Sequence, residues 1–244
     1  FEIEVRKYKD MNLKGGAVID GFPSVGLVST ITASFLIASL ELDQIAALDS
    51  EYFPPFTMIY AGKPKFPARI YASEQMKLAV FTSEFTPLAF LDRSIGRLVF
   101  NWAREQGCSL IITSVGLPVD EVEVEPRGLE VLGVGSTDKA RRMLQEAGVD
   151  QLDAGIIAGI PGTLLNEGRW MNFDVLALLV KAHKLIPDVR AAARIVEVIG
   201  RLLPHARVDV EPLIAEGKKI EDRIKAMRSQ VKPIEPPLPR DMYR

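Results

Sequence analysis

Short, nearly continuous apolar runs constrain the fold of this 244-residue chain more than any other feature. They occupy residues 17–21, 78–82, 109–115 and 173–180. None alternates apolar with polar side chains, as a strand with one face in water does. Strands of this kind are covered on both faces, which is typical of parallel sheets flanked by helices. The sequence therefore predicts an α/β fold, a three-layer sandwich with a mostly parallel sheet.

Segments with helical spacing separate the apolar runs. They span residues 24–40, 88–106 and 137–146. Gly107 is suited to end the second of these helices, and Ser136 is a plausible N-cap for the third. A short strand is expected around Val131 and another over residues 155–160. Strand and helix thus alternate along most of the chain, as an α/β domain requires.

Residues 51–72 interrupt this alternation. Four prolines stand among aromatic side chains there, namely Pro54, Pro55, Pro64 and Pro67. Proline donates no hydrogen bond to a sheet, so the segment is predicted to form a hairpin or an extended insertion. Its aromatic side chains would suit a contact between subunits.

The last fifth of the chain has a different composition. Residues 188–203 are predicted to form a helix with Pro187 in its first turn. The next helix, at 211–232, carries apolar residues in a heptad-like rhythm, which favours a partner helix. The proline-rich residues after it favour an extended, semi-rigid spacer. We therefore expect a core domain at 1–210, an oligomerisation helix at 211–232 and a spacer with a terminal tail at 233–244.

Charge and composition exclude several classes of function. Thirty basic and 32 acidic side chains leave a formal net charge of −2, which does not favour nucleic acid as a partner. The apolar stretches are too short or too interrupted to cross a membrane, and the N-terminus does not resemble a secretory signal. The one cysteine, Cys108, cannot form an internal disulfide, which fits a cytoplasmic location.

The glycine-containing segment 21–26 superficially resembles a phosphate-binding loop. Leu27 and Val28 stand where such a loop needs lysine and serine or threonine, so a Walker-type nucleotide site is rejected. A tight turn is preferred to a weaker anion site built from backbone amides. Glycines at 159–162 are placed at a predicted strand end, where α/β proteins often bind ligands, but a simple turn is preferred because no catalytic side chains lie nearby in the sequence.

No set of side chains predicts catalysis, a cofactor or a metal ion. Ser24 has no histidine tied to it by order or spacing, because His183 and His205 lie far along the chain and far from each other. An acidic cluster is better explained as a solvated strand face than as a cation site. It consists of Asp120, Glu121, Glu123 and Glu125. The alternative that stays open is a small-molecule or nucleotide-binding enzyme with a pocket around 21–26 and 159–162.

The last three residues are the strongest candidate for a binding site. Met242, Tyr243 and Arg244 follow the proline-rich spacer and offer an apolar side chain, a penultimate tyrosine and a terminal carboxylate. A pocket on a partner protein can capture such an ending.

Several of these segments together resemble the proteasome assembly chaperone family in its archaeal form. The resemblance spans nearly the whole chain and is carried by residues 21–26, 159–165, 187–193, 208–210 and the ending Met242-Tyr243-Arg244. It implies a nucleoside-phosphorylase-like fold without catalytic equipment, a homo-oligomer, and docking on the α subunits of the proteasome core particle. In that mode the carboxylate of Arg244 would meet a lysine of the partner, with the Tyr243 ring packed beside it.

Overall fold

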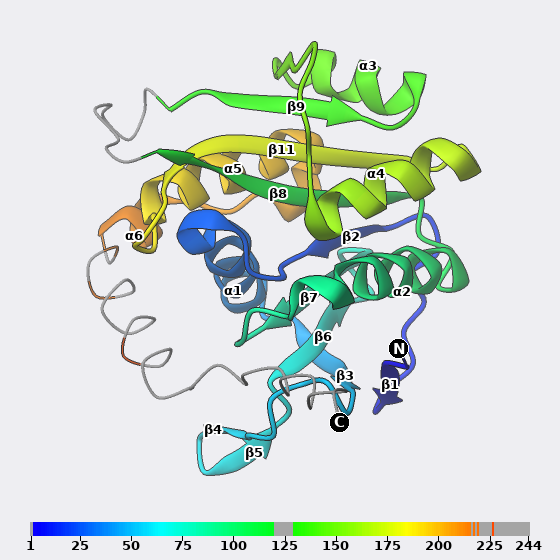
Figure 1. The fold of residues 1–244 in the computed structure, drawn as a ribbon, viewed down its shortest axis with the longest axis vertical. Helices are drawn as coiled ribbons and strands as arrows, with labels where there is room; N and C mark the ends of the chain where they lie inside the picture. Colours follow the sequence, from blue (N-terminus) through cyan, green and yellow to red (C-terminus); the bar gives the residue numbers. More distant parts are fainter. Residues whose placement is uncertain (1, 120–128, 216, 218, 220–225, 227–244) are drawn as a thin grey trace, which may run out of the picture.

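The computed structural model of this protein describes residues 2–119, 129–215, 217, 219 and 226. Within them, nine strands form one sheet in the order β1-β3-β6-β7-β2-β8-β11-β9-β10 (Figure 1). The strands are β1 (Glu4–Lys7), β2 (Ala17–Asp20), β3 (Asp43–Asp49), β6 (Ala68–Ser73), β7 (Leu78–Ser83), β8 (Leu110–Val119), β9 (Val131–Gly135), β10 (Asp150–Gln151) and β11 (Asp174–His183). The sheet therefore extends well beyond the four apolar runs.

The centre of the sheet is parallel and its flanks are mixed. Strands β7, β2, β8 and β11 run parallel to one another. Strands β6, β3 and β1 continue one side in antiparallel pairs, and β9 pairs antiparallel with β11 on the other. All residues of β2 and β7 are buried, as expected for central strands covered on both faces.

Helices cover both faces of the sheet. They are η1 (Val25–Leu27), α1 (Val28–Ser39), η2 (Ala89–Leu91), α2 (Asp92–Glu105), α3 (Asp138–Glu146), α4 (Gly159–Met171), α5 (Val189–Leu202), η4 (Pro204–Ala206) and α6 (Glu211–Ala215). Helices α1 and α5 pack together over one core, and α2 and α4 pack together over a second. Ile19 belongs to the first core and its neighbour Val18 to the second, so the sheet lies between them. The three-layer α/β prediction is confirmed (Figure 1).

The strand expected over 155–160 is wrong. This stretch is a loop that leads into α4, whose N-cap is Ala158, and Ile156 is 97% exposed. Pro161 stands in the first turn of the helix, where its missing N–H breaks no intrahelical hydrogen bond. The short apolar run suggested a buried strand, whereas the proline marks a helix start.

Two predicted helix starts shift by one residue. Thr137, not Ser136, caps α3, because its Oγ1 accepts a hydrogen bond of 3.0 Å from the Ala140 amide. Ser136 Oγ instead lies 2.7 Å from the Phe173 carbonyl oxygen and 2.8 Å from the Val175 amide nitrogen, and so binds the start of β11. At α5 the cap is Asp188, and Pro187 precedes the helix.

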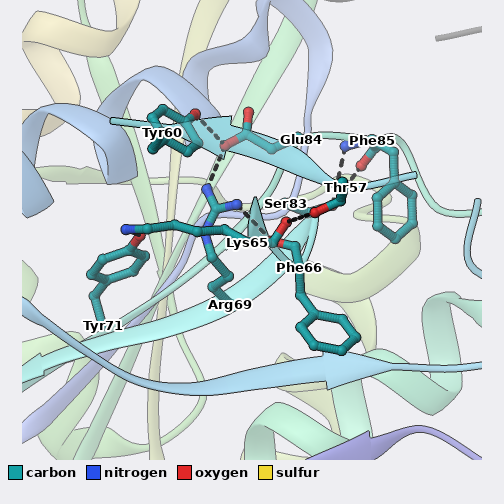
Figure 2. Close-up of polar contacts among 9 residues, drawn as sticks. All are labelled: Thr57, Tyr60, Lys65, Phe66, Arg69, Tyr71, Ser83, Glu84 and Phe85. Carbon is teal, nitrogen blue, oxygen red and sulfur yellow. Dashed lines mark hydrogen bonds and ion pairs between the residues drawn. The ribbon is translucent and has the colours of Figure 1, made fainter. Parts of the chain in front are cut away.

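The proline-rich insertion is a hairpin, as predicted, but a shorter one. Strands β4 (Met58–Tyr60) and β5 (Lys63–Lys65) pair antiparallel, and the chain after them enters the main sheet as β6. Arg69 of β6 is 3% exposed and donates hydrogen bonds to Glu84 (2.5 Å) and to the Phe66 carbonyl (2.6 Å). Figure 2 shows Tyr60 of the hairpin donating to the same carboxylate, at 3.1 Å. This cluster therefore anchors the hairpin to the sheet.

The C-terminal predictions fall mostly outside the described residues. Helix α6 begins at Glu211, where the oligomerisation helix was expected, and Leu213 is buried against the first core. The remainder of the 211–232 helix, apart from isolated positions, and the whole of 233–244 lie beyond what the structure describes. Among the described helices, none is both long and apolar enough to span a bilayer.

Candidate functional site

The two glycine-containing segments that the sequence singled out meet at one pocket. The cavity measures about 510 Å³ and lies at the carboxyl end of β2 and beside the middle of β8, where residues 114–116 line it. Residues 22–25, following β2, form one part of its wall, and residues 158–161, at the start of α4, form another. The segment between β7 and α2 adds Thr86 and Pro87. Crevices at the carboxyl ends of parallel strands are where open α/β sheets commonly bind ligands.

The glycines of segment 21–26 are required by close packing. A Cβ on Gly21 would lie 2.3 Å from both the Ala33 Cβ and the Phe81 carbonyl oxygen. Gly26 has φ of 64°, and a Cβ there would approach the Ala182 Cβ to 2.8 Å. Both positions exclude a side chain, and Gly26 also needs the left-handed conformation that glycine adopts readily. This agrees with the tight turn preferred for the segment.

Asp20 ends β2 at the wall of the pocket. Its side chain is 2% exposed and accepts hydrogen bonds from Thr113 Oγ1 (2.7 Å) and from the Phe22 amide (3.0 Å). Burial raises the pKa of this carboxyl to about 6, with the charge of Asp92 adding to the effect and the two hydrogen bonds opposing it. A carboxylate in this position is still mostly ionised at neutral pH.

Asp92 is the second carboxylate of the pocket and the first residue of α2. Burial raises its pKa from the ordinary value. Its Oδ2 faces the first turn of α4, because a Cβ on Gly159 would lie 3.3 Å from that oxygen. Asp20 and Asp92 are the only ionisable side chains among the described residues that line the pocket, so its lining is acidic.

Serine hydroxyls form a small network beside the carboxylates. Ser24 Oγ lies 2.8 Å from Ser29 Oγ, and Ser114 Oγ donates to Ser29 Oγ at 3.0 Å. His183 makes other contacts: its Nδ1 accepts from the Leu185 amide at 3.2 Å, and its own amide donates to Asp188. No histidine lines the described part of the pocket. Ser24 therefore has no histidine base among the described residues that line the pocket.

The remaining candidates from the sequence lie elsewhere. Met242, Tyr243 and Arg244 are outside the described residues, and so are the acidic positions 120, 121, 123 and 125. Among the described residues, no group of three or more His, Cys, Asp or Glu side chains is placed to hold a metal ion. Cys108 is buried, and burial raises the pKa of its thiol to about 11, so it is a poor nucleophile at neutral pH.

Comparison with known proteins places the chain in a family. The model of the PAC2 family matches residues 18–228. The chain belongs to the PAC2 family. An uncharacterised protein of Methanocaldococcus jannaschii is 25% identical to this PAC2 chain over 213 residues, which cover 87% of the chain and 85% of the relative.

Several solved structures have a fold similar to that of this chain. PbaA of Pyrococcus furiosus, an archaeal homologue of a proteasome-assembly chaperone, has a TM-score of 0.84 and 29% identity, covering 94% of this chain and 97% of that one. A Thermoplasma acidophilum protein of unknown function has a TM-score of 0.77 and 27% identity, over 90% and 88% of the two chains. PbaB of P. furiosus, an archaeal proteasome activator, shares the fold with a TM-score of 0.75 and 21% identity, over 93% and 99%. This PAC2 chain is thus homologous to proteins of the proteasome assembly chaperone family.

From the sequence, a pocket at this place was only an alternative to two simple turns, and its two carboxylates were missed. Asp20 follows three apolar residues in a buried strand, and an acid that ends such a run is itself a signal. Asp92 gave no signal, because an acidic residue in the first turn of a helix is ordinary. Only the fold brings the two together.

Proposed function

We propose that this PAC2 protein is a proteasome-binding factor that works as an assembly chaperone or activator-like partner of the core particle, without enzymatic activity. The observation that carries the proposal is the likeness to PbaA, at 29% identity over 94% of this chain. PbaB, a proteasome activator, has the same fold. The absence of a histidine among the described pocket residues agrees with a role in binding.

The proposed docking element is the ending Met242-Tyr243-Arg244. Its terminal carboxylate would pair with a lysine in a pocket between α subunits of the core particle, a charge-assisted contact. The Tyr243 ring would add apolar area with a polar tip. The proline-rich residues 233–239 would carry this ending away from the folded domain as a semi-rigid spacer.

A homo-oligomer would make such an ending effective. One three-residue contact binds weakly, but several endings on one particle raise the effective concentration at the ring. Helix α6 begins at Glu211 with Leu213 packed on the core, so the helix that follows would start from a fixed point. The chain would work in the cytoplasm, where a reduced Cys108 is expected.

Deleting Tyr243 and Arg244 tests the proposal. The truncated protein should keep its fold, because both residues lie beyond every described element, and it should no longer be retained on immobilised core particles. A second variant adds one glycine after Arg244. It keeps all side chains but moves the terminal carboxylate, and it should also lose binding. Retention that survives both changes would refute docking through this ending.

A further inference from the structure

The pocket described above has a chemistry that the proposed proteasome role does not use. Its walls combine apolar side chains with two acids. Several apolar residues of the lining remain at least partly exposed, among them Pro23, Val115 and Pro161. No lysine, arginine or histidine lines the described part of the pocket. A cavity of about 510 Å³ falls within the size range of small-molecule sites.

The two carboxylates differ in their exposure to the cavity, and together they favour a positively charged ligand. Asp92 is partly exposed to the cavity, whereas Asp20 is 2% exposed at its wall. Asp20 keeps acceptor capacity, since Thr113 and Phe22 supply two hydrogen bonds to a group with about four lone-pair positions. Both acids are buried enough that nearby charge is poorly screened by water.

This arrangement discriminates among ligand classes. An anion such as a nucleotide phosphate would meet two like charges, although the first turn of α4 offers backbone amides near Asp92. A neutral apolar molecule would compensate the charge of neither carboxylate, and Asp20 would keep only its hydrogen bonds from Thr113 and Phe22. A cation with a hydrocarbon body satisfies both features, because its charge compensates the acids while its body covers the apolar wall.

We propose that the pocket binds a small organic cation, a primary amine or an amidine, whose charged head pairs with Asp92 while Asp20 adds a second negative charge behind it. The hydrocarbon body packs on Pro23, Val115 and Pro161. This site is separate from the proposed docking tail and does not depend on it. It also argues against a nucleotide as the small molecule in this pocket, because the phosphates of a nucleotide carry the same sign of charge as the two carboxylates.

Calorimetric titration of the full chain tests the proposal with three cations, benzylamine, benzamidine and isopentylamine. Benzyl alcohol and benzoate serve as neutral and anionic controls of the same shape. At least one of the cations should bind, and the two controls should not. Asp92→Asn should weaken that binding by about tenfold or more, the loss expected for a hydrogen bond to a charged group.

Two further variants make the result specific. Asp20→Asn should weaken binding by a smaller factor than Asp92→Asn, because Asp20 acts through its charge behind the contact. Asp150→Asn removes a charge from an exposed position on β10 and should leave binding unchanged. The proposal fails if no cation binds, if benzyl alcohol or benzoate binds as well as benzylamine, or if Asp150→Asn weakens binding as much as Asp92→Asn. Thermal unfolding of each variant checks that it is folded.

Discussion

The ion pair between Arg69 and Glu84 should contribute substantially to stability, and Glu84→Gln tests this. The side chains of Arg69 and Glu84 are 4% and 18% exposed, and their closest atoms lie 2.5 Å apart. Burial lowers the pKa of Arg69, but the charge of Glu84 and its hydrogen bond, with smaller effects from Tyr71 and Tyr60, outweigh it and leave the pKa raised. Glu84 thus compensates a guanidinium charge that is buried.

Removing the carboxylate leaves that charge without compensation. Breaking a buried ion pair by removing one partner costs about 3–5 kcal/mol. The actual loss should be near the lower end, because Arg69 keeps the Phe66 carbonyl and lies over the rings of Tyr60 and Tyr71, at 5.5 and 5.9 Å. We therefore expect Glu84→Gln to lower the free energy of unfolding by about 3 kcal/mol.

Urea denaturation at a fixed protein concentration measures this loss. The double variant Arg69→Met with Glu84→Gln should be more stable than Glu84→Gln alone, because it leaves no unpaired buried charge. As a matched control, Glu167→Gln breaks a pair with Arg97, whose side chain is 58% exposed, and should cost less than about 1 kcal/mol. A cost for Glu84→Gln no greater than that of Glu167→Gln, or losses that simply add in the double variant, would refute the reasoning.

Two other substitutions follow from the pocket and its loop. Because the pKa of Asp20 is raised to about 6, the folded state binds more protons than the unfolded state between about pH 4 and 6, so stability falls as pH rises through this window. Asp20→Asn should remove this fall. Its free energy of unfolding relative to wild type should therefore rise by about 3 kcal/mol between pH 4 and 7 in urea titrations. A difference between variant and wild type that does not change with pH would contradict this. Gly26→Ala combines a positive φ with a 2.8 Å approach to Ala182 and should destabilise by about 2–4 kcal/mol, whereas Gly62→Ala, also at positive φ but with nothing within 4 Å, should cost about 1 kcal/mol in the same assay. Equal losses would show that packing around Gly26 is unimportant.

The central part of the fold could be predicted from apolar runs alone. Strands β7 and β2 are buried throughout, β8 and β11 are buried over their first halves, and each strand contains most of a predicted run. The antiparallel flank could not be predicted in the same way. β3 is buried only in its middle, and β1 is a partly exposed edge strand, so their apolar content is weaker. Their pairing depends on the rest of the sheet.

A pocket at this place was an alternative reading of the sequence, and the carboxylates in it were not predicted. The two glycine segments were marked because turns and close packing require glycine, and they do meet in space. Their approach depends on residues 159–162 starting a helix, whereas the sequence placed them at a strand end. Asp20 and Asp92 are 72 positions apart in the sequence, and no local pattern relates them.

Equilibrium binding to purified core particles tests the central claim most directly, using wild type, Tyr243→Phe and Tyr243→Ala in one surface plasmon resonance series. The proposal predicts that Tyr243→Ala loses binding and that Tyr243→Phe, which keeps the ring, retains an intermediate affinity. Two control substitutions in the folded domain, Asp150→Asn on β10 and Glu167→Gln on α4, should bind as wild type does. Unchanged affinity of Tyr243→Ala would contradict docking of this PAC2 protein through its last residues.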